Sequence, residues 1–236
     1  MPSIRMTMLV KLLHYTPEPE AAIALAARLC YSPVTIEAMQ EKLSGSDIKS
    51  FLEKIMSLGH QSVLEHASFT FGIEGISRVT THQLVRHRIA SFSQQSQRYV
   101  SHKDQFSAVT PPSIADNPVM SERFSAHLQS LHRFYAEMVE AGIPAEDARY
   151  ILPNATETKI MVTMNAREML HFLRLRCCER AQWEIRAMAL EMLKLLKGVA
   201  PTIFKDAGPG CLGGTCPEGR MTCGKISEVR DFFKTL

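Results

Sequence analysis

A dense cluster of cationic and amide side chains occupies residues 86 to 99, which read RHRIASFSQQSQRY. No Asp or Glu occurs between Glu74 and Asp104, so an acidic group elsewhere in the fold, or a ligand, must face these charges. The guanidinium fork of arginine matches two phosphate oxygens at once, and Ser, Gln and His add directional hydrogen bonds. We therefore predict that this segment holds a phosphate and a flat polar ring, in preference to a solvated surface.

A second arginine cluster occupies residues 165 to 183, NAREMLHFLRLRCCERAQW. At 3.6 residues per turn, Arg167, His171 and Arg174 fall on one side of a helix and Arg176 falls on the opposite side. A surface helix normally has one polar and one apolar face. Two interpretations follow: a surface helix whose arginines extend over apolar neighbours, or a helix enclosed on both sides whose arginines contact more than one ligand or subunit.

Metal and thiol chemistry have weaker signals. The segment GHQSVLEH (59–66) lacks the HExxH spacing that puts two ligands and a base on one helix face, so we predict no metal site. Cys211, Cys216 and Cys223 lack CxxC pairs. Free thiols are favoured there, and a disulfide or redox pair and a zinc site are the alternatives.

Length and composition are those of a soluble globular protein. The 236 residues are 45% hydrophobic and 22% charged, and no stretch approaches the roughly 18 apolar residues of a membrane span. The net charge of +3 is too small for a protein that coats nucleic acid and suits a small anionic ligand. The N-terminus has no signal-peptide pattern and the cysteines form no disulfide framework, so we expect a cytoplasmic protein.

The elements that must position these clusters are a few strands and several long helices. Composition predicts strands at 6–15, 66–77 and 156–165 and an extended segment at 91–100. Periodicity and end signals predict helices at 17–32, 46–60 (with Ser46 as cap and Gly59 as stop), 77–88, 117–142, 144–153 and 166–201. The sequence thus predicts a single α+β domain over residues 1–236 with an antiparallel-type sheet, whose Gly- and Cys-rich tail is irregular from about residue 203.

These motifs resemble those of the flavin-dependent thymidylate synthases. The family signature runs Arg-His-Arg, two variable positions, Ser, and a polar stretch that ends Ser-x-Arg-Tyr, as in RHRIASFSQQSQRY. GHQSVLEH, QLVRHR, ARYILP, NAREMLHFLRLR and AQWEIR follow in the family's order, so the resemblance covers most of residues 20 to 200. It implies a homotetramer with active sites shared between subunits, and conversion of dUMP to dTMP with FAD, NADPH and 5,10-methylenetetrahydrofolate. It implies no nucleic-acid or membrane partner.

The resemblance also implies roles for individual residues. The implied FAD contacts are Ser62, Arg86, His87, Arg88, Gln94, Asn165, Arg167 and His171. The implied dUMP contacts are Gln83, Leu84, Val85, Arg86, Gln94, Gln95, Ser96, Gln97, Arg98, Arg149 and Arg176. Arg176 is the implied catalytic residue, which polarises the uracil ring at N3. Many members have Asn-Glu where this chain has Ser93-Gln94, and Asn is common at the position of His171.

Two other functions stay open on the sequence alone. A basic nucleotide- or nucleic-acid-binding module without synthase activity would use the same cationic segment, and its affinity would fall steeply with salt. The second possibility is a flavoprotein of this fold that has no synthase activity. It stays open because the amide of Gln94 can hydrogen-bond a nucleotide but cannot act as the carboxylate that many family members have at this position.

Overall fold

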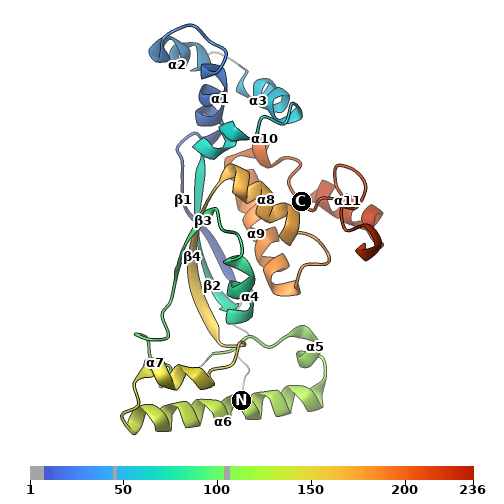
Figure 1. Ribbon diagram of the computed structural model, residues 1–236. Coiled ribbons are helices and arrows are strands. Elements are labelled where there is room, and N and C mark those ends of the chain that lie inside the picture. Colours follow the sequence, from blue (N-terminus) through green and yellow to red (C-terminus); the bar gives the residue numbers. More distant parts are fainter. Residues whose placement is uncertain (1–7, 45–46, 104–106) are drawn as a thin grey trace. The chain divides into compact units, whose positions relative to one another are not determined.

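Four strands form one sheet in the computed structural model, which describes residues 8–44, 47–103 and 107–236. The strands are β1 Leu9–Tyr15, β2 Ser68–Ser77, β3 Ala90–Gln94 and β4 Glu157–Asn165, in the order β1-β2-β4-β3 (Figure 1). Just past the end of β2, the backbone N–H of Arg78 donates to the carbonyl of Thr156. Just past the end of β4, that of Ala166 donates to Ala67. β2 and β4 are therefore antiparallel, and the predicted α+β class with its antiparallel-type sheet is confirmed.

Most of the predicted elements are present. The three predicted strands are β1, β2 and β4. Four of the predicted helices correspond to α1 Pro19–Leu29, α3 Ile48–Ser57, α6 Pro118–Glu140, and α7 Ala145–Ala148 with the 3-10 turn η2 Arg149–Ile151. The predicted cap Ser46 lies outside the described residues, and α3 is capped by Asp47, whose side chain accepts from the Ser50 N–H. Helix α2, Ile36–Ser44, was not predicted.

The prediction of one helix over 166–201 is wrong. The structure has three helices here: α8 Ala166–Arg176, α9 Trp183–Val199 and the short α10 Pro201–Phe204. The backbone at Gln182 is extended, and the Gln182 side chain accepts from the N–H groups of Glu184 and Ile185 at 3.1 Å each. This cap satisfies donors that would otherwise be orphaned at the start of α9, and it stabilises the break.

Three further boundaries differ from the prediction. Helix α4, Arg78–Leu84, ends before the RHR motif, so Gln83 and Arg86 do not share a helical face. The extended segment predicted at 91–100 is a strand only as far as the end of β3, and a turn follows at 97–99. The tail ends in a helix, α11 Ile226–Thr235. Only the segment between α10 and α11 is irregular, and it contains one 3-10 turn, η3 Gly219–Met221.

Contacts divide the chain into two compact units. Among the described residues, unit 1 comprises 8–9, 73–86 and 92–161, and unit 2 comprises 10–72, 87–91 and 162–236. The assignment of a single domain stays a prediction. Within the described part of the chain, no helix is both long and apolar enough to cross a membrane.

Unit 1 is built on its long helix. Helix α6 packs against α5, Pro112–Ala115, and against α7 and η2 (Figure 1). Of the 23 residues of α6, all of them described, Tyr135 alone is buried. The other large buried side chains of this unit include Ile76 and Leu84. Much of the α6 surface is therefore left for solvent or for another chain.

Unit 2 contains the larger core. Helix α8 packs on α9 and on the 3-10 turn η1, Ser62–His66, while α1 packs on α2, α3 and η1. Met169, Phe172 and Leu173 of α8 are fully buried, whereas Arg167 and His171 on the same helix are exposed. Helix α8 thus presents exposed polar side chains on one face, and its opposite face is apolar apart from the buried Glu168 and the half-buried Arg176.

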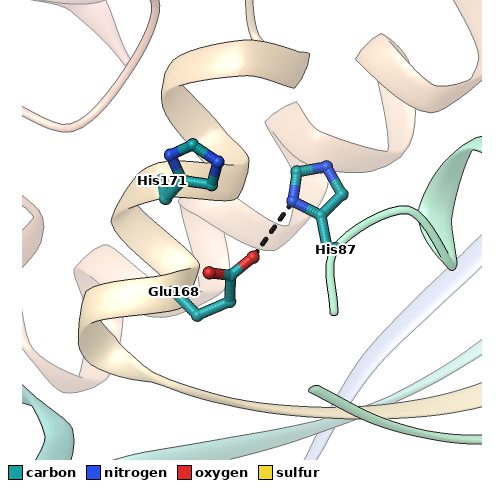
Figure 2. A group of neighbouring side chains, drawn as sticks. All are labelled: His87, Glu168 and His171. Atoms are coloured by element: carbon teal, nitrogen blue, oxygen red, sulfur yellow. Dashed lines mark hydrogen bonds and ion pairs between the residues drawn. The ribbon is translucent and has the colours of Figure 1, made fainter. Parts of the chain in front are cut away.

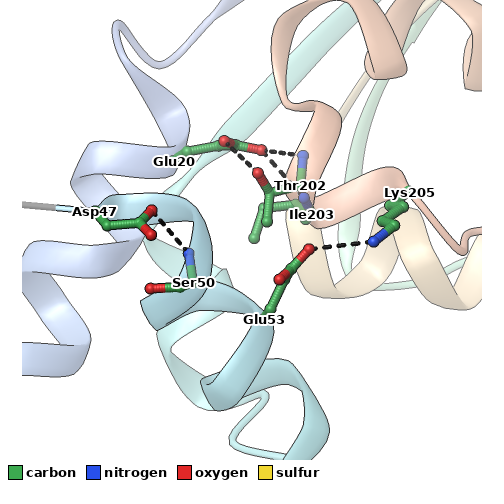
Figure 3. Close-up of polar contacts among 7 residues, drawn as sticks. All are labelled: Glu20, Asp47, Ser50, Glu53, Thr202, Ile203 and Lys205. Carbon is green, nitrogen blue, oxygen red and sulfur yellow. Dashed lines mark hydrogen bonds and ion pairs between the residues drawn. The ribbon is translucent and has the colours of Figure 1, made fainter.

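The half-buried carboxylate of Glu20 links α1 to α10 in unit 2 (Figure 3). The Glu20 carboxylate accepts from the backbone N–H of Thr202 at 2.5 Å, from its hydroxyl at 2.9 Å and from the N–H of Ile203 at 3.1 Å. These are the first backbone donors of α10, where a negative charge is favoured. Nearby, Lys205 pairs with Glu53 at 3.2 Å on the surface.

Candidate functional site

His87 is a buried histidine on the short segment between α4 and β3, with 4% of its surface exposed. Figure 2 shows its ring beside two residues of α8, Glu168 and His171. His87 Nδ1 lies 3.1 Å from Glu168 Oε1, and the His87 ring packs edge-on against Phe172 with centroids 5.0 Å apart. The RHR motif is thus anchored to α8 through its central residue, and all of these side chains belong to unit 2.

The hydrogen bonds of His87 define its tautomer. Arg176 Nε donates to His87 Nε2 at 3.1 Å. An arginine Nε–H can only donate, so Nε2 must be the accepting nitrogen and the ring proton lies on Nδ1. His87 then donates from Nδ1 to Glu168. The result is a directed chain in which Glu168 orients His87 and His87 orients the guanidinium of Arg176, the implied catalytic residue.

The electrostatics agree with a neutral His87. Burial, and then the positive charges of Arg176 and His171, lower the pKa of His87 from 6.5 to about 4. Burial also raises the pKa of Glu168 above its ordinary value, against the opposing effect of His171. Burial lowers the pKa of Arg176, although an arginine stays protonated under all ordinary conditions. Near neutral pH the ring of His87 accepts from Arg176 without competing for the proton.

The same three side chains could be taken for a metal site. His87, Glu168 and His171 each offer a ligand atom, and these atoms lie within 4.8 Å of one another. However, both nitrogens of His87 are already engaged, and one of them faces the cationic guanidinium of Arg176. A metal cation bound to His87 Nε2 would have to displace the guanidinium of Arg176 and would be repelled by its positive charge. The geometry favours the hydrogen-bonded chain over a metal.

Four of the six implied FAD contacts of unit 2 line two pockets that share Arg167, and His87 and Arg88 line neither. One pocket, of about 480 Å³, is lined by Ser62 and Arg167 among others. The other, of about 460 Å³, is lined by Asn165, Arg167 and His171, with Ile89 beside them. Arg167 also pairs with Glu65 at 2.6 Å on the surface. The structure therefore brings together four of the implied contacts around one guanidinium.

The flanking arginines of the RHR motif are exposed. Arg86 and Arg88 lie in the irregular segment that follows α4, and neither has a salt-bridge partner among the described residues. The expected acidic group faces other members of the cluster: Glu168 faces His87, and Glu146 pairs with Arg98 at 2.6 Å. The charges of Arg86 and Arg88 are left for a ligand.

The implied dUMP contacts other than Arg176 lie in unit 1. Gln94, at the end of β3, donates from Nε2 to the hydroxyls of Thr81 at 3.2 Å and Thr158 at 3.4 Å. Both threonines are buried, so the amide is held in one orientation. Leu84 is fully buried, whereas Val85 is 40% exposed. The described structure therefore leaves the surface of Val85, and not that of Leu84, open to a ligand.

The turn after β3 presents further polar groups. The Ser96 hydroxyl accepts from the backbone N–H of Arg98 at 3.1 Å, which caps the turn.

Arg149 Nε donates to the carbonyl of Glu146 at 3.0 Å. Burial, and then the charge of Arg149, lower the pKa of Arg78. Two guanidinium groups thus lie close enough in unit 1 to repel one another, an arrangement that an anion would stabilise.

Sequence reasoning missed Glu168, Thr81 and Thr158, the residues that hold the implied site residues in place. The signal for Glu168 was available, because a glutamate four residues before Phe172 lies on the apolar side of the helix. A carboxylate there indicates a buried partner. Thr81 and Thr158 gave no such signal, since their pairing with Gln94 depends on the register of the sheet.

Comparisons with known proteins identify the family to which this chain is similar. Residues 11–202 match the family model described as thymidylate synthase complementing protein. A protein of Geobacter sulfurreducens named flavin-dependent thymidylate synthase is 65% identical over 97% of this chain and 99% of the relative. Relatives with the same name from Clostridium tetani and Pyrococcus horikoshii are 50% and 45% identical, over 95% and 96% of this chain and 96% and 97% of their own lengths.

Proposed function

The chain belongs to the flavin-dependent thymidylate synthase family, and on that premise we propose that it is a flavoenzyme that methylates dUMP to dTMP. The observation that carries the proposal is the match, over nearly the whole chain, to relatives named for this activity. In the finer form of the proposal, FAD is the flavin, NADPH its reductant and 5,10-methylenetetrahydrofolate the one-carbon donor. The comparisons give no support to a nucleic-acid-binding module.

The residues of unit 2 suit FAD. The two pockets that share Arg167 offer an amide at Asn165, a hydroxyl at Ser62 and guanidinium charge for a pyrophosphate. Ile89 and Leu64, in the second pocket, offer apolar contact to a flat ring. We assign the flavin contacts of this unit to these residues and to Arg88. Arg86 and Gln94, which belong to unit 1, stay predicted flavin contacts. His87 is buried, so its role there is to support the motif.

The residues of unit 1 suit the nucleotide. Arg98 and Arg149 supply charge for the phosphate, and the fixed amide of Gln94 supplies directional hydrogen bonds. Gln83, Leu84, Val85, Arg86, Gln95, Ser96 and Gln97 complete the proposed dUMP set of this unit, and Leu84 among them is fully buried. The phosphate must compete with Glu146 for Arg98, because that ion pair is already formed on the surface.

Arg176 supplies the electrostatic part of the chemistry. Negative charge develops on the pyrimidine when C6 is attacked, and a fixed guanidinium beside N3 stabilises it. A reduced flavin held by the residues of unit 2 would supply hydride for C6, so that no cysteine nucleophile would be needed. Burial raises the pKa of the Cys177 thiol to about 12, so Cys177 stays protonated. The chain of Glu168, His87 and Arg176 then keeps the guanidinium in one orientation through the reaction.

The exposed apolar surface of α6 supports the proposed homotetramer. Val119, Phe134 and Met120 on this helix are 61%, 51% and 45% exposed. Large apolar side chains gathered on one helix are typical of a protein interface. Light scattering coupled to size exclusion tests the assembly, and a monomeric mass at micromolar concentration would refute it. The cytoplasmic location stays a prediction.

The decisive experiment measures absorbance and turnover on the purified full-length chain. We expect a flavin spectrum after incubation with FAD, bleaching by NADPH, and dTMP formation once dUMP and methylenetetrahydrofolate are added. Arg176→Ala should retain the flavin and lose turnover, whereas Arg220→Ala, an exposed arginine on η3, should be unchanged. A wild-type chain that binds FAD but makes no dTMP would refute the proposal.

A further inference from the structure

A cationic pocket lies among the first three helices of unit 2. Its volume is about 300 Å³, and its walls include Arg28 in the last turn of α1, Lys42 of α2 and Phe51 of α3. Val34 and Met39 add apolar surface to the wall. Within the described part of the chain, the lining contains no carboxylate. The pocket therefore presents two positive charges and an apolar wall to a ligand.

Arg28 is positioned by packing, and its hydrogen-bonding capacity is not satisfied by the protein. Its Cζ lies over the ring of Phe51, 5.0 Å from the centroid, in a cation–π contact that holds the guanidinium against α3. Its Nε is buried and has no hydrogen-bond partner among the described residues. Neither Arg28 nor Lys42 forms an ion pair with any residue that the structure describes. A partly buried, unpaired guanidinium favours a bound anion.

The pocket suits an extended chain of carboxylates better than a compact phosphate. A phosphate is commonly held by several donors that converge on one point, such as the free N–H groups at the start of a helix. At the start of α2, however, the N–H of Ala38 already donates to the hydroxyl of Thr35 at 3.3 Å. Arg28 and Lys42 come from two different helices and share the pocket with apolar side chains. Carboxylates separated by methylene groups offer charge to both cations and apolar contact to the wall.

Tyr31 connects this cationic pocket to one of the two proposed flavin pockets. Its side chain lines both the cationic pocket and the pocket of about 480 Å³ that contains Ser62 and Arg167. The Tyr31 side chain is 71% exposed, so its ring can contact a ligand. A ligand that extends from the flavin pocket past Tyr31 therefore reaches Arg28 and Lys42.

We propose that Arg28 and Lys42 bind the glutamate tail of the folate co-substrate, an inference that rests on the proposed function. A folate consists of a flat pterin, an aminobenzoyl ring and one or more γ-linked glutamates, in that order. The pterin end carries the one-carbon unit and must lie at the flavin pocket. The aminobenzoyl ring then falls to Tyr31, and the glutamate carboxylates fall to the two cations. The order of groups along the ligand matches the order of surfaces along the protein.

The test compares two reduced folates that differ only in the tail: tetrahydropteroate, which has no glutamate, and tetrahydropteroyl-triglutamate. Calorimetry under nitrogen measures their dissociation constants on the full-length chain loaded with FAD. The wild type should bind the triglutamate at least about tenfold more tightly. Arg28→Gln and Lys42→Gln should each weaken the triglutamate about fivefold and leave the pteroate unchanged. Lys49→Gln, which removes an exposed charge of α3 outside the pocket, is the matched control and should change neither constant.

Lys42 is exposed, so its replacement keeps the proposal testable if Arg28→Gln disturbs the packing on Phe51. Equal affinities of the wild type for the two folates, or binding of neither, would overturn the proposal. Formation of dTMP by the same chain would then show that the proposed function stands without it. Variants that bind the triglutamate as tightly as the wild type does would also overturn it.

Two further outcomes separate this site from its alternatives. If the variants lost the preference for NADPH over NADH in flavin reduction while folate binding stayed unchanged, the pocket would belong to the 2′-phosphate of the reductant and the proposal would be wrong. If the wild type made no dTMP and both variants still weakened the triglutamate, the tail site would be supported and only the proposed function would be refuted.

Discussion

Glu168→Gln tests whether the buried carboxylate acts on catalysis through His87 and Arg176. The glutamine has the same shape, and its Oε1 can still accept from His87 Nδ1, so the packing of the site is kept. What is lost is the negative charge that makes His87 Nε2 a better acceptor for Arg176 Nε. The orientation of the guanidinium should therefore become less strongly defined.

The expected size of the effect follows from these two hydrogen bonds. A bond to a charged group contributes roughly 1.5–3 kcal/mol and a neutral one roughly 0.5–1.5 kcal/mol, so the variant loses about 1 kcal/mol. At 1.36 kcal/mol per tenfold change in rate, this lowers kcat about fivefold. The affinity for FAD should change little. Glu191→Gln, which alters an exposed pair with Lys194, is the matched control and should leave kcat unchanged.

A double-mutant cycle separates positioning from other roles. Steady-state dTMP formation is measured at one fixed pH in both backgrounds, together with the dissociation constant for FAD. In an Arg176→Lys background the Nε–H donor to His87 is gone, so Glu168→Gln should cost little more. If Glu168→Gln lowered kcat fivefold in both backgrounds, Glu168 would not act through His87 on Arg176, and the proposed positioning role would be refuted. Weakened FAD binding with normal kcat would instead place Glu168 in the flavin pocket that it lines.

Three further predictions concern stability and binding. The pKa of His87 falls from 6.5 to about 4 on folding, so the unfolded chain binds a proton at His87 before the folded chain does. The free energy of unfolding should therefore fall by up to about 3 kcal/mol as the pH drops from about 6.5 to 4. Urea unfolding of His87→Asn should show a smaller fall over that range. Glu20→Ala removes three hydrogen bonds at α10 and should lower the free energy of unfolding by about 2–4 kcal/mol, whereas Glu53→Ala, which breaks an exposed pair, should change it by less than about 1 kcal/mol. Glu146→Gln frees Arg98 and should tighten dUMP about twofold to fivefold by calorimetry; weaker binding would contradict competition for that guanidinium.

The sequence was most informative where one periodicity held over a whole element. Alternation in β2 and β4 and the long polar-apolar repeat of α6 predicted those elements within a few residues. The predictions were wrong at helix ends that are set by a single capping side chain. Gln182 caps α9 within a run of good helix formers, with neither glycine nor proline to mark the break. The end of α4 before the RHR motif was equally unmarked.

The candidate site could be anticipated as a set of residues but not as an arrangement. The family signature identified His87, and only the fold shows that it is buried and directed at Glu168 and Arg176. The contacts of Gln94 with Thr81 and Thr158 and the convergence of Cys178, Cys211 and Cys216 on one pocket are likewise long-range. Such contacts depend on sheet register and helix packing, which the local sequence does not determine.

The clamp of Glu20 on α10 has a consequence for biosynthesis. Its two ends are 182 residues apart, and unit 2 is assembled from three separate stretches of the chain. During translation at roughly 5–20 residues per second, α1 must wait roughly 10–40 s for its partner to appear. Throughout that interval the apolar residues Ile23, Ala24 and Ala27, all buried in the finished protein, have no partner from the last stretch. We expect the nascent N-terminal helices to be recognised by chaperones, and the compact state of unit 2 to form only after α10 has left the ribosome.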